Sequence, residues 1–558
     1  MRGYWFNKPS LHFGRRPPFN WLILCLVSVL VLIILFGSSS DSFDSVDISR
    51  GPDVYSDHAN VKSQVIVDYL DLRHFEPNRS KVFDLCGKES ENYVPCYNVT
   101  ANLLAGFKDG EELDRHCQLS KSHHFCLIRP PKDYKIPLSW PVGRDVIWSA
   151  NVKLSKDQFL SSGSMTKRLM LLEENQISFN SEDEMVADGV KDYSNQIAEM
   201  MGLASDADFR SAGVRNVLDI GCGFGSFGAH LLSLKLMVVC VANYESTGSQ
   251  VQVALERGLP AFIGDFISRQ LPLPSLSYDM VHCAQCGISW HDKDGMFLIE
   301  IDRILKPGGY FVLTSPSKQQ GIKGGISTPF EQFIGKLCWK QVSQQEETFI
   351  WKKTSDAECY TTFSKQTYAV CEGESSQSYY KPLGQCISVA GSKRWRPIQN
   401  VSSISPDLAL HGINPEDFAD DMEIWRGVLR NYWSLLSPLI FSDHPKRPGD
   451  EDPSPPYNMV RNIMDANARY GGFNGALLEA RKSAWVMNVV PFGESDTLPF
   501  VLDQGFAGIL HDWCEPFPTY PRTYDMIHGE GLLSHVATTR KCSVVDLTFE
   551  MDRILRPE

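Results

Sequence analysis

The middle of the chain alternates between short apolar runs and segments whose apolar residues recur at helical spacing. From Gly213 onward this pattern predicts five strands and three helices. The expected strands are Val214 to Ile220, Leu236 to Ala242, Ala261 to Ile263, Tyr278 to Cys283 and Tyr310 to Thr314. The expected helices are Phe227 to Leu234, Ser249 to Arg257 and Met296 to Leu305. Such alternation predicts a doubly wound, parallel α/β sheet, which binds ligands beyond the carboxyl ends of its strands.

An internal repeat links this region with the end of the chain. Three ordered blocks recur at separations of 246, 246 and 250 residues: Val217 to Asp219 as Ile463 to Asp465, Tyr278 to His282 as Tyr524 to His528, and Glu300 to Pro307 as Glu550 to Pro557. We therefore expect two tandem related lobes of Rossmann-like fold. The second copy lacks the glycine pattern of the first and stops where Gly308 and Gly309 would follow, so we expect it to be degenerate and incomplete.

The N-terminus carries an uninterrupted apolar run from Trp21 to Phe36. Basic residues precede the run and acidic residues follow it, which predicts a type II signal anchor at 21–37 with a cytosolic tail at 1–20. A cleaved signal peptide is the alternative interpretation. Residues 38–80 are expected to be a lumenal stem. Glycosylation sites compatible with a lumenal body are predicted at Asn78, Asn98 and Asn400.

Length and composition fit a mostly globular chain of several domains. It has 558 residues, of which 43% are hydrophobic and 22% charged. After the stem we expect an N-terminal lumenal region at 81–210, a first lobe at 211–387, a linker at 388–456 and a second lobe at 457–558. In the N-terminal region, Lys167 to Glu174 and Asp192 to Met201 have helical periodicity. A net charge of −13 argues against nucleic acid as a partner.

Cysteine usage is compatible with disulfides. The chain has 15 cysteines, and Cys25 lies within the apolar run, so an even number remains outside it. Cys283 and Cys286 have CxxC spacing, but no second pair matches them, so no metal site is expected. The best disulfide candidates, whose pairing is left open, are Cys86, Cys96, Cys117 and Cys126.

The turn after the first strand is the strongest functional signal. Gly221, Gly223 and Gly225 follow Asp219 closely, and Gly223 with Gly225 and Gly228 also fits a dinucleotide fingerprint. A pyrophosphate would be repelled by the carboxylate of Asp219, whereas S-adenosylmethionine (SAM) carries an ammonium and a sulfonium that a carboxylate attracts. The turn therefore favours SAM over a dinucleotide, and a tight turn without any ligand is the structural alternative.

Acidic residues near later strands complete the predicted cofactor site. Glu245 lies just past the second strand, where a carboxylate can accept both ribose hydroxyls. Asp265 follows the third strand and could accept from the adenine amino group, and Asp279 opens the fourth strand. An exposed loop acid is the plain alternative for Glu245 and Asp265.

Three residues near the end of the fourth strand are weaker candidates. His282 ends that strand, and Trp290 and His291 follow in a loop over the same edge. His282 and His291 are the first suspects for a general base, if the reaction needs one. The alternatives are a satisfied core histidine for His282 and ordinary loop packing for the other two.

From about residue 81 to its end, the chain resembles a plant family of cell-wall methyltransferases. Within the family it looks like the Quasimodo branch, Golgi proteins implicated in methylation of the pectin homogalacturonan. The blocks that carry the resemblance are Pro137 to Pro141, Leu255 to Pro260, Gln270 to Pro272, His282-Cys283, Leu305 to Gly309, Trp485 to Pro491, His511 to Glu515 and Tyr520 to Asp525. Gln176 to Phe179 and Asn243 to Glu245 favour the Quasimodo branch.

The resemblance implies a type II Golgi membrane protein whose lumenal, SAM-dependent domain methylates galacturonate carboxylates. A carboxylate is ionised near neutral pH and needs no general base, so the chemistry demands no particular catalytic residue. Family members continue beyond the position of Glu558, which puts folding of the second lobe in doubt. The alternatives are a non-catalytic Golgi scaffold that partners a wall glycosyltransferase, and methylation of another polysaccharide acceptor.

Overall fold

The computed structural model divides the chain into two compact units, Met1–Lys62 and Ser63–Glu558. All described residues lie in the second unit, and they are 146–152, 171–173, 176–179, 189–243, 250–264, 269–290, 292–315, 328–356, 358–359, 369–370, 383, 386–387, 415–440, 460–482, 484–493, 496–539 and 544–556. Within these ranges, no helix is both long and apolar enough to cross a membrane. The expected tail, anchor and stem lie outside the described residues, as do the three glycosylation sites and the four clustered cysteines.

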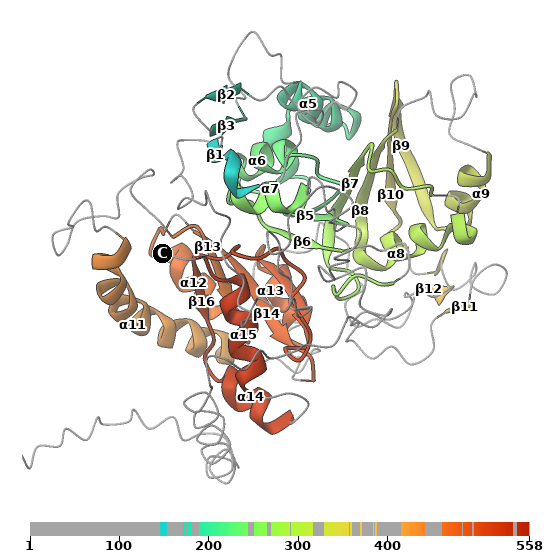
Figure 1. Cartoon of the computed structure of the whole chain (residues 1–558). Coiled ribbons are helices and arrows are strands. Elements are labelled where there is room, and N and C mark those ends of the chain that lie inside the picture. Colours follow the sequence, from blue (N-terminus) through green and yellow to red (C-terminus); the bar gives the residue numbers. More distant parts are fainter. Residues whose placement is uncertain are drawn as a thin grey trace, which may run out of the picture. The chain divides into compact units, whose positions relative to one another are not determined.

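A seven-stranded sheet forms the first lobe, which we define as residues 189–359 (Figure 1). Its strands are β4 (Asn216–Ile220), β5 (Met237–Ala242), β6 (Ala261–Ile263), β7 (Tyr278–Ala284), β8 (Leu305–Thr314), β9 (Trp339–Gln345) and β10 (Thr348–Lys353). Their order is β6-β5-β4-β7-β8-β10-β9, with β4 to β8 parallel and β10 antiparallel to both neighbours. The chain order reverses between β4 and β7, which is where ligands bind in Rossmann-like sheets.

Two layers of helices cover this sheet. On one face, α5 (Val190–Met200) and α6 (Ser226–Ser233) pack against Val217 and the side chains that share its face. On the other, α7 (Gln250–Glu256), α8 (Met296–Ile304) and α9 (Thr328–Lys336) pack against Leu218 and its neighbours. The alternation of Val217 and Leu218 between two cores explains why this strand is apolar throughout. The predicted strands and helices of this lobe are confirmed, although β8 begins at Leu305, five residues before the predicted start at Tyr310.

One sequence-based prediction is wrong. Within the predicted helix from Lys167 to Glu174, residues Leu171–Glu173 form strand β2. This strand pairs antiparallel with β3 (Gln176–Ser178), which pairs antiparallel with β1 (Val146–Trp148). A short apolar run fits strand and helix equally well, and pairing with β3 decides it here.

The remaining short elements of the unit lie before, within or just after the first lobe along the sequence. Strands β11 (Ala369–Val370) and β12 (Cys386–Ile387) form a parallel pair. Single turns of 3₁₀ helix are η1 (Ser149–Asn151) and η2 (Asp206–Phe209), whereas η3 (Asp292–Gly295) is an irregular turn in which Lys293 and Asp294 have left-handed φ.

A four-stranded parallel sheet forms the second lobe, defined as residues 415–556. Its strands are β13 (Asn462–Asp465), β14 (Trp485–Pro491), β15 (Ala507–His511) and β16 (Met526–His528), in the order β15-β14-β13-β16. Its helices are α11 (Pro415–Ile440), α12 (Gly472–Glu479), α13 (Leu498–Asp503), α14 (Leu532–Thr539) and α15 (Val544–Ile554). The order of the four strands in chain and space is the same as that of β4 to β7 in the first lobe.

Contacts between the two lobes come in reciprocal pairs. The side-chain amide of Asn216 donates to the carbonyl of Leu502, and that of Asn462 donates to the carbonyl of Leu255 at 2.8 Å. Both asparagines begin the first strand of their lobe, and both acceptors lie in the helix after the second strand.

Backbone hydrogen bonds and ion pairs between the lobes are also reciprocal. The N–H of Ile263 donates to the carbonyl of Pro518 at 2.8 Å, and that of Leu510 donates to the carbonyl of Pro272 at 3.0 Å. Lys306 bridges Asp279 and Asp503, whereas Arg556 bridges Asp525 and Glu256. Each lobe thus offers the other the same surface, as the subunits of a twofold dimer do.

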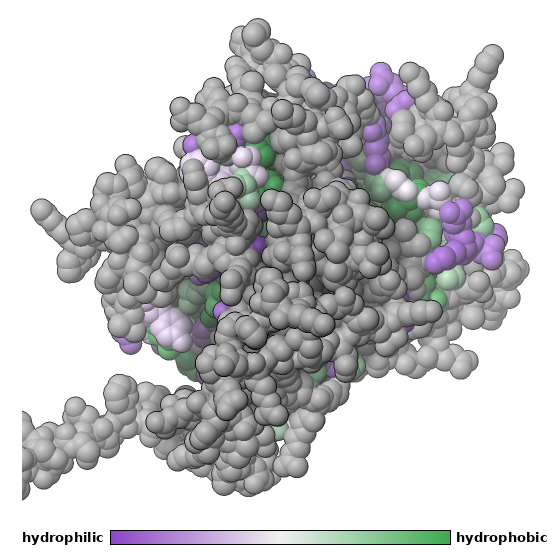
Figure 2. Space-filling model, in the orientation of Figure 1, coloured by the Kyte–Doolittle hydropathy of each residue, from purple (hydrophilic) through white to green (hydrophobic). Residues whose placement is uncertain are grey.

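Strand β9 lies at one edge of the first sheet. Its side chains from Lys340 to Gln345 are mostly polar and largely exposed, and hydrophilic residues are visible there in Figure 2. Polar and charged side chains on an edge strand discourage pairing with other chains. This edge is therefore protected, and it lies four strands away from β4.

Candidate active site

The glycine-rich turn lies at the carboxyl end of β4, as predicted. Gly221, Gly223 and Gly225 all have positive φ, at 67°, 58° and 76°. A Cβ on Gly221 would lie 2.7 Å from the Cβ of Cys286, so two segments approach each other there without room for a side chain. Both conditions favour glycine, and they bring backbone rather than side chains to the sheet edge where a ligand would bind.

Asp219 is the first member of a buried chain of hydrogen bonds. Its Oδ1 lies 2.7 Å from Nδ1 of His282, and Nε2 of His282 lies 2.9 Å from the hydroxyl of Tyr193. That hydroxyl lies 2.7 Å from Oγ1 of Thr314. Burial raises the pKa of Tyr193 well above its ordinary value, so the phenol remains protonated at neutral pH. Both ring nitrogens of His282 are engaged, and the ring is 1% exposed.

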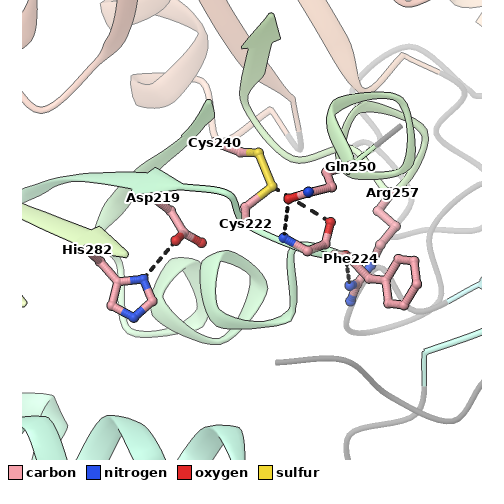
Figure 3. The surroundings of a disulfide bond; sticks show 8 residues. Asp219, Cys222, Phe224, Cys240, Gln250, Arg257 and His282 are labelled. Carbon is pink, nitrogen blue, oxygen red and sulfur yellow. Dashed lines mark hydrogen bonds and ion pairs between the residues drawn. A yellow bond between two sulfur atoms is a disulfide. The ribbon is translucent and has the colours of Figure 1, made fainter. Parts of the chain in front are cut away.

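Three ties that the sequence did not reveal hold the glycine-rich turn (Figure 3). The N–H of Gly223 donates to Oε1 of Gln250 at 2.9 Å, from the start of α7. Arg257 donates to the carbonyl of Phe224 at 2.5 Å. A disulfide joins Cys222 in the turn to Cys240 in β5. Each partner is 18 to 33 residues away along the chain, beyond the reach of local sequence patterns.

A second disulfide lies beside the turn. Cys283 lies near the carboxyl end of β7, where a ligand would bind. It is bonded to Cys286, whose Cβ faces Gly221. The CxxC spacing seen in the sequence therefore serves a disulfide rather than a metal. With Cys222 and Cys240, it places two disulfides around the carboxyl end of β4.

The other predicted site residues have mixed outcomes. Glu245, Asp265 and His291 lie outside the described residues. Trp290 is 6% exposed and packs edge-on against Phe311 at 5.2 Å between ring centroids, which is the plain packing alternative.

The placement of Asp279 corrects an expectation. This residue lies at the amino end of β7, opposite the ligand edge, and Oδ2 accepts the N–H groups of Arg215 and Asn216 at 2.8 and 3.0 Å. Oδ1 lies 3.1 Å from Nζ of Lys306. Its carboxylate is thus committed to the start of β4 and to the lobe interface, so the structure does not bring it to the cofactor site.

The second lobe has a different arrangement at the same edge. Gly471 keeps positive φ at 79°, but Arg469 stands where Gly223 would be and adopts φ of 44°. Within the described residues, no hydrogen bond joins Asp465 to His528, the counterparts of Asp219 and His282. Burial raises the pKa of Asp465 to about 8 and lowers that of His528 to about 4.

The residues of the first lobe fit SAM. Bare backbone at the three glycines allows a close approach, and Asp219 is fixed beside them by His282. A carboxylate at this edge suits the cationic groups of SAM and opposes a pyrophosphate. The chemistry available there is alignment of a methyl group with an acceptor.

Comparison with known proteins agrees with this assignment. A family described as "Putative S-adenosyl-L-methionine-dependent methyltransferase" matches residues 92–558. "Probable methyltransferase PMT5" of Arabidopsis thaliana is 59% identical over 571 residues, covering 100% of this chain and 92% of that protein. "Probable pectin methyltransferase QUA2" of Arabidopsis thaliana is 52% identical, covering 92% of this chain and 77% of that protein.

Solved structures include more distant likenesses. A structure titled "putative sarcosine dimethylglycine methyltransferase" from Galdieria sulphuraria aligns with a TM-score of 0.22 and 18% identity, over 27% of this chain and 62% of that chain. A TehB-like SAM-dependent methyltransferase from Corynebacterium glutamicum aligns with a TM-score of 0.21 and 17% identity, over 30% of this chain and 97% of that chain.

Proposed function

Because this chain belongs to the S-adenosyl-L-methionine-dependent methyltransferase family, we propose that it methyl-esterifies galacturonate carboxylates of pectin in the Golgi lumen. The chain is a methyltransferase and its cofactor is SAM. The acceptor and the compartment are the proposed parts. A relative that is 52% identical is named as a probable pectin methyltransferase, which supports the acceptor.

The state of His282 is the observation that carries the choice of acceptor. A hydroxyl acceptor needs a base to take its proton, and His282 was the first suspect among the described residues. Its two ring nitrogens lie within 2.9 Å of Asp219 and Tyr193, and it is 1% exposed, so it cannot serve an incoming hydroxyl. A galacturonate carboxylate is ionised near neutral pH and requires no base.

The roles of the first lobe's residues follow from this chemistry. Gly221, Gly223 and Gly225 admit the cofactor to the edge of the sheet, and Asp219 attracts its positive charge. His282 acts as a positioning residue by holding Asp219. When bound, SAM supplies an electrophilic methyl group that a carboxylate oxygen can accept, and the rate gain would come from alignment and exclusion of water.

Disulfides support the proposed compartment. The described residues contain Cys222–Cys240, Cys283–Cys286 and Cys338–Cys359, and Cys514 is also disulfide-bonded. Disulfides persist in oxidising compartments and are rare in the cytosol. Together with the predicted type II anchor and the predicted glycosylation sites, they favour a lumenal body. Protease protection of sealed microsomes tests this: a body that is digested without detergent would contradict it.

A methyl-transfer assay tests the reaction. The full-length protein is incubated with methyl-labelled SAM and de-esterified homogalacturonan, and the polymer is then treated with mild alkali. Ester-bound label is released as methanol, which is the expected result. Label that resists alkali would indicate a hydroxyl acceptor, and SAM binding without transfer would favour the scaffold alternative. Asp219→Ala should abolish transfer, and the matched change Asp465→Ala in the second lobe should not.

A further inference from the structure

Asp421 on α11 reaches the second lobe's counterpart of the cofactor turn. Its Oδ2 accepts the backbone N–H of Gly472 at 2.9 Å, and its Oδ1 accepts the indole N–H of Trp425 at 3.1 Å. Gly472 is the first residue of α12, the helix that follows the degenerate turn. A carboxylate of this chain therefore occupies the first amide of that helix, where the positive end of the helix dipole favours an anion.

The helices that precede the two sheets can be aligned by their contacts. Tyr193 on α5 packs edge-on against Phe227 and His282, with ring centroids 5.7 Å apart in both cases. Trp425 on α11 packs edge-on against Phe473 and His528, at 5.5 and 4.6 Å. Phe227 and Phe473 are 246 residues apart, as are His282 and His528. Tyr193 and Trp425 are thus equivalent by position.

This alignment pairs Asp421 with a glycine. Four residues before Trp425 is Asp421, and four residues before Tyr193 is Gly189, which has left-handed φ of 60° and caps the start of α5. A Cβ on Gly189 would meet nothing within 4 Å. The helix in the second lobe instead continues back to Pro415 and carries Asp421 over the turn.

The residue that faces Asp421 is a glycine in the second lobe, and the equivalent residue in the first lobe is larger. Gly472 touches Asp421 so closely that a Cβ there would lie 2.7 Å from the carboxyl carbon of Asp421 and 2.9 Å from its backbone carbonyl carbon. The equivalent position in the first lobe is Ser226, the first residue of α6. The second lobe therefore pairs a carboxylate with a glycine that admits it, and the first lobe pairs an open glycine with a larger residue.

We propose that Asp421 is an internal carboxylate that fills the second lobe's cofactor position by occupying the first amide of α12, the helix that follows the degenerate turn. This rests on the proposed placement of the cofactor in the first lobe. The two lobes, in the part of the chain that the structure describes, then hold a single SAM site, and Gly189 is the residue that leaves it open. Burial raises the pKa of Asp421, and the N–H of Gly472 opposes that shift by stabilising the charge.

Binding stoichiometry tests the proposal independently of the acceptor. Calorimetric titration of the full-length protein with S-adenosylhomocysteine should give one site per chain, and Asp219→Ala should remove it. Two sites per chain, or one site that survives in Asp219→Ala, would overturn the proposal. No binding at all by the wild type would instead remove the first-lobe placement on which it rests.

A rescue experiment tests Asp421 directly. Asp421→Ala should lower Tm, and acetate should restore part of the loss relative to chloride at equal ionic strength, because it can occupy the vacated amide. Acetate should not change Tm of the wild type or of Asp420→Ala, the exposed neighbouring carboxylate. If Asp421→Ala does not fold, Asp421→Asn should retain the contact with Gly472 and show a smaller loss of Tm. Unchanged Tm in both Asp421 variants would refute the proposal.

Discussion

The two lobes agree where they face each other and differ where their strands end. At the interface, Lys306 and Arg556 make equivalent ion pairs, and Asn216 and Asn462 exchange equivalent hydrogen bonds. At the carboxyl edge, the first lobe has three left-handed glycines and a bonded Asp219–His282 pair. The second has one of these glycines, and within the described residues its Asp465 accepts the backbone N–H of Asn467 and is not bonded to His528.

This contrast separates the requirements of the fold from those of the site. A sheet with buried strands and a reciprocal interface can tolerate Arg469 at the place of Gly223, because the residue lies at an exposed turn. A cofactor that must reach the backbone cannot tolerate that exchange. The proposed function thus depends on a few positions grafted on a shared framework, and the second lobe packs against the first through the reciprocal interface.

Breaking the interface should have the largest effect. Lys306→Met removes the cation from Asp279, which is 0% exposed, and should destabilise the protein by about 3–5 kcal/mol in urea denaturation. Arg556→Met should do less, because its partner Asp525 has a side chain that is 11% exposed. Lys340→Met on the exposed edge strand β9 is the control and should remain within about 0.5 kcal/mol of the wild type. Equal losses of stability in Lys306→Met and Lys340→Met would show that the interface does not stabilise the protein.

Removing the covalent tie of the turn should come next. Cys222 and Cys240 are 18 residues apart, and a double Cys→Ser variant should lose about 3 kcal/mol of stability. It should also bind SAM about 10-fold more weakly, or about 1.4 kcal/mol, because the glycine-rich turn is released. The counterparts in the second lobe are Ala468 and Asn488, which cannot form such a tie.

The matched control for this disulfide lies at the far edge of the same sheet. Replacing Cys338 and Cys359 by serine should lower stability and leave the Kd for SAM unchanged, since that disulfide begins next to β9. Equal effects of both double variants on the Kd would show that the tie at the turn has no special role. Calorimetry and thermal unfolding supply the two readouts.

The two aspartates at the strand ends should respond to mutation in opposite directions. Asp465 has a folded pKa of about 8 against an ordinary 3.8, so unfolding releases its proton between these values and stability falls as pH rises. His528, with a folded pKa of about 4 against an ordinary 6.5, has the opposite effect only below pH 6.5. The window from pH 6.5 to 8 therefore isolates Asp465.

In that window, Asp465→Asn should gain stability over the wild type by about 1.4 kcal/mol per pH unit. Asp219→Ala should lose about 1–3 kcal/mol instead, because the buried ring of His282 loses its acceptor. Urea denaturation at several pH values measures both. A difference between Asp465→Asn and the wild type that does not change with pH would contradict the role assigned to Asp465.

The sequence predicted the local parts of this molecule and missed its long-range ties. The strands from β4 to β7 and the glycine-rich turn are visible because apolar runs and glycines mark them locally. Strand β9 was not predicted, because its exposed edge position leaves it largely polar and without a buried run. Leu171–Glu173 was predicted as a helix because a short apolar run fits either structure.

At the site, long separations hid the partners. Tyr193 meets His282 across 89 residues of sequence, and Arg257 meets Phe224 across 33. No spacing rule links such residues, so only the folded sheet brings them together. Asp279 was wrongly predicted to bind the cofactor. It lies at the amino end of β7, and ligands bind at the carboxyl ends of parallel strands.

The smallest predicted effect concerns the side chains that hold the two turns. Gln250 accepts the N–H of Gly223 at 2.9 Å, and its counterpart Thr497 donates its hydroxyl to the carbonyl of Arg469. Gln250→Ala and Thr497→Ala should each cost about 1 kcal/mol of stability, the net worth of one hydrogen bond. Only Gln250→Ala should weaken SAM binding, by about 5-fold, because only its turn receives the cofactor. A Kd that rises equally in both variants would mean that the second lobe also supports the site, and the separation of fold from function drawn between the lobes would fail.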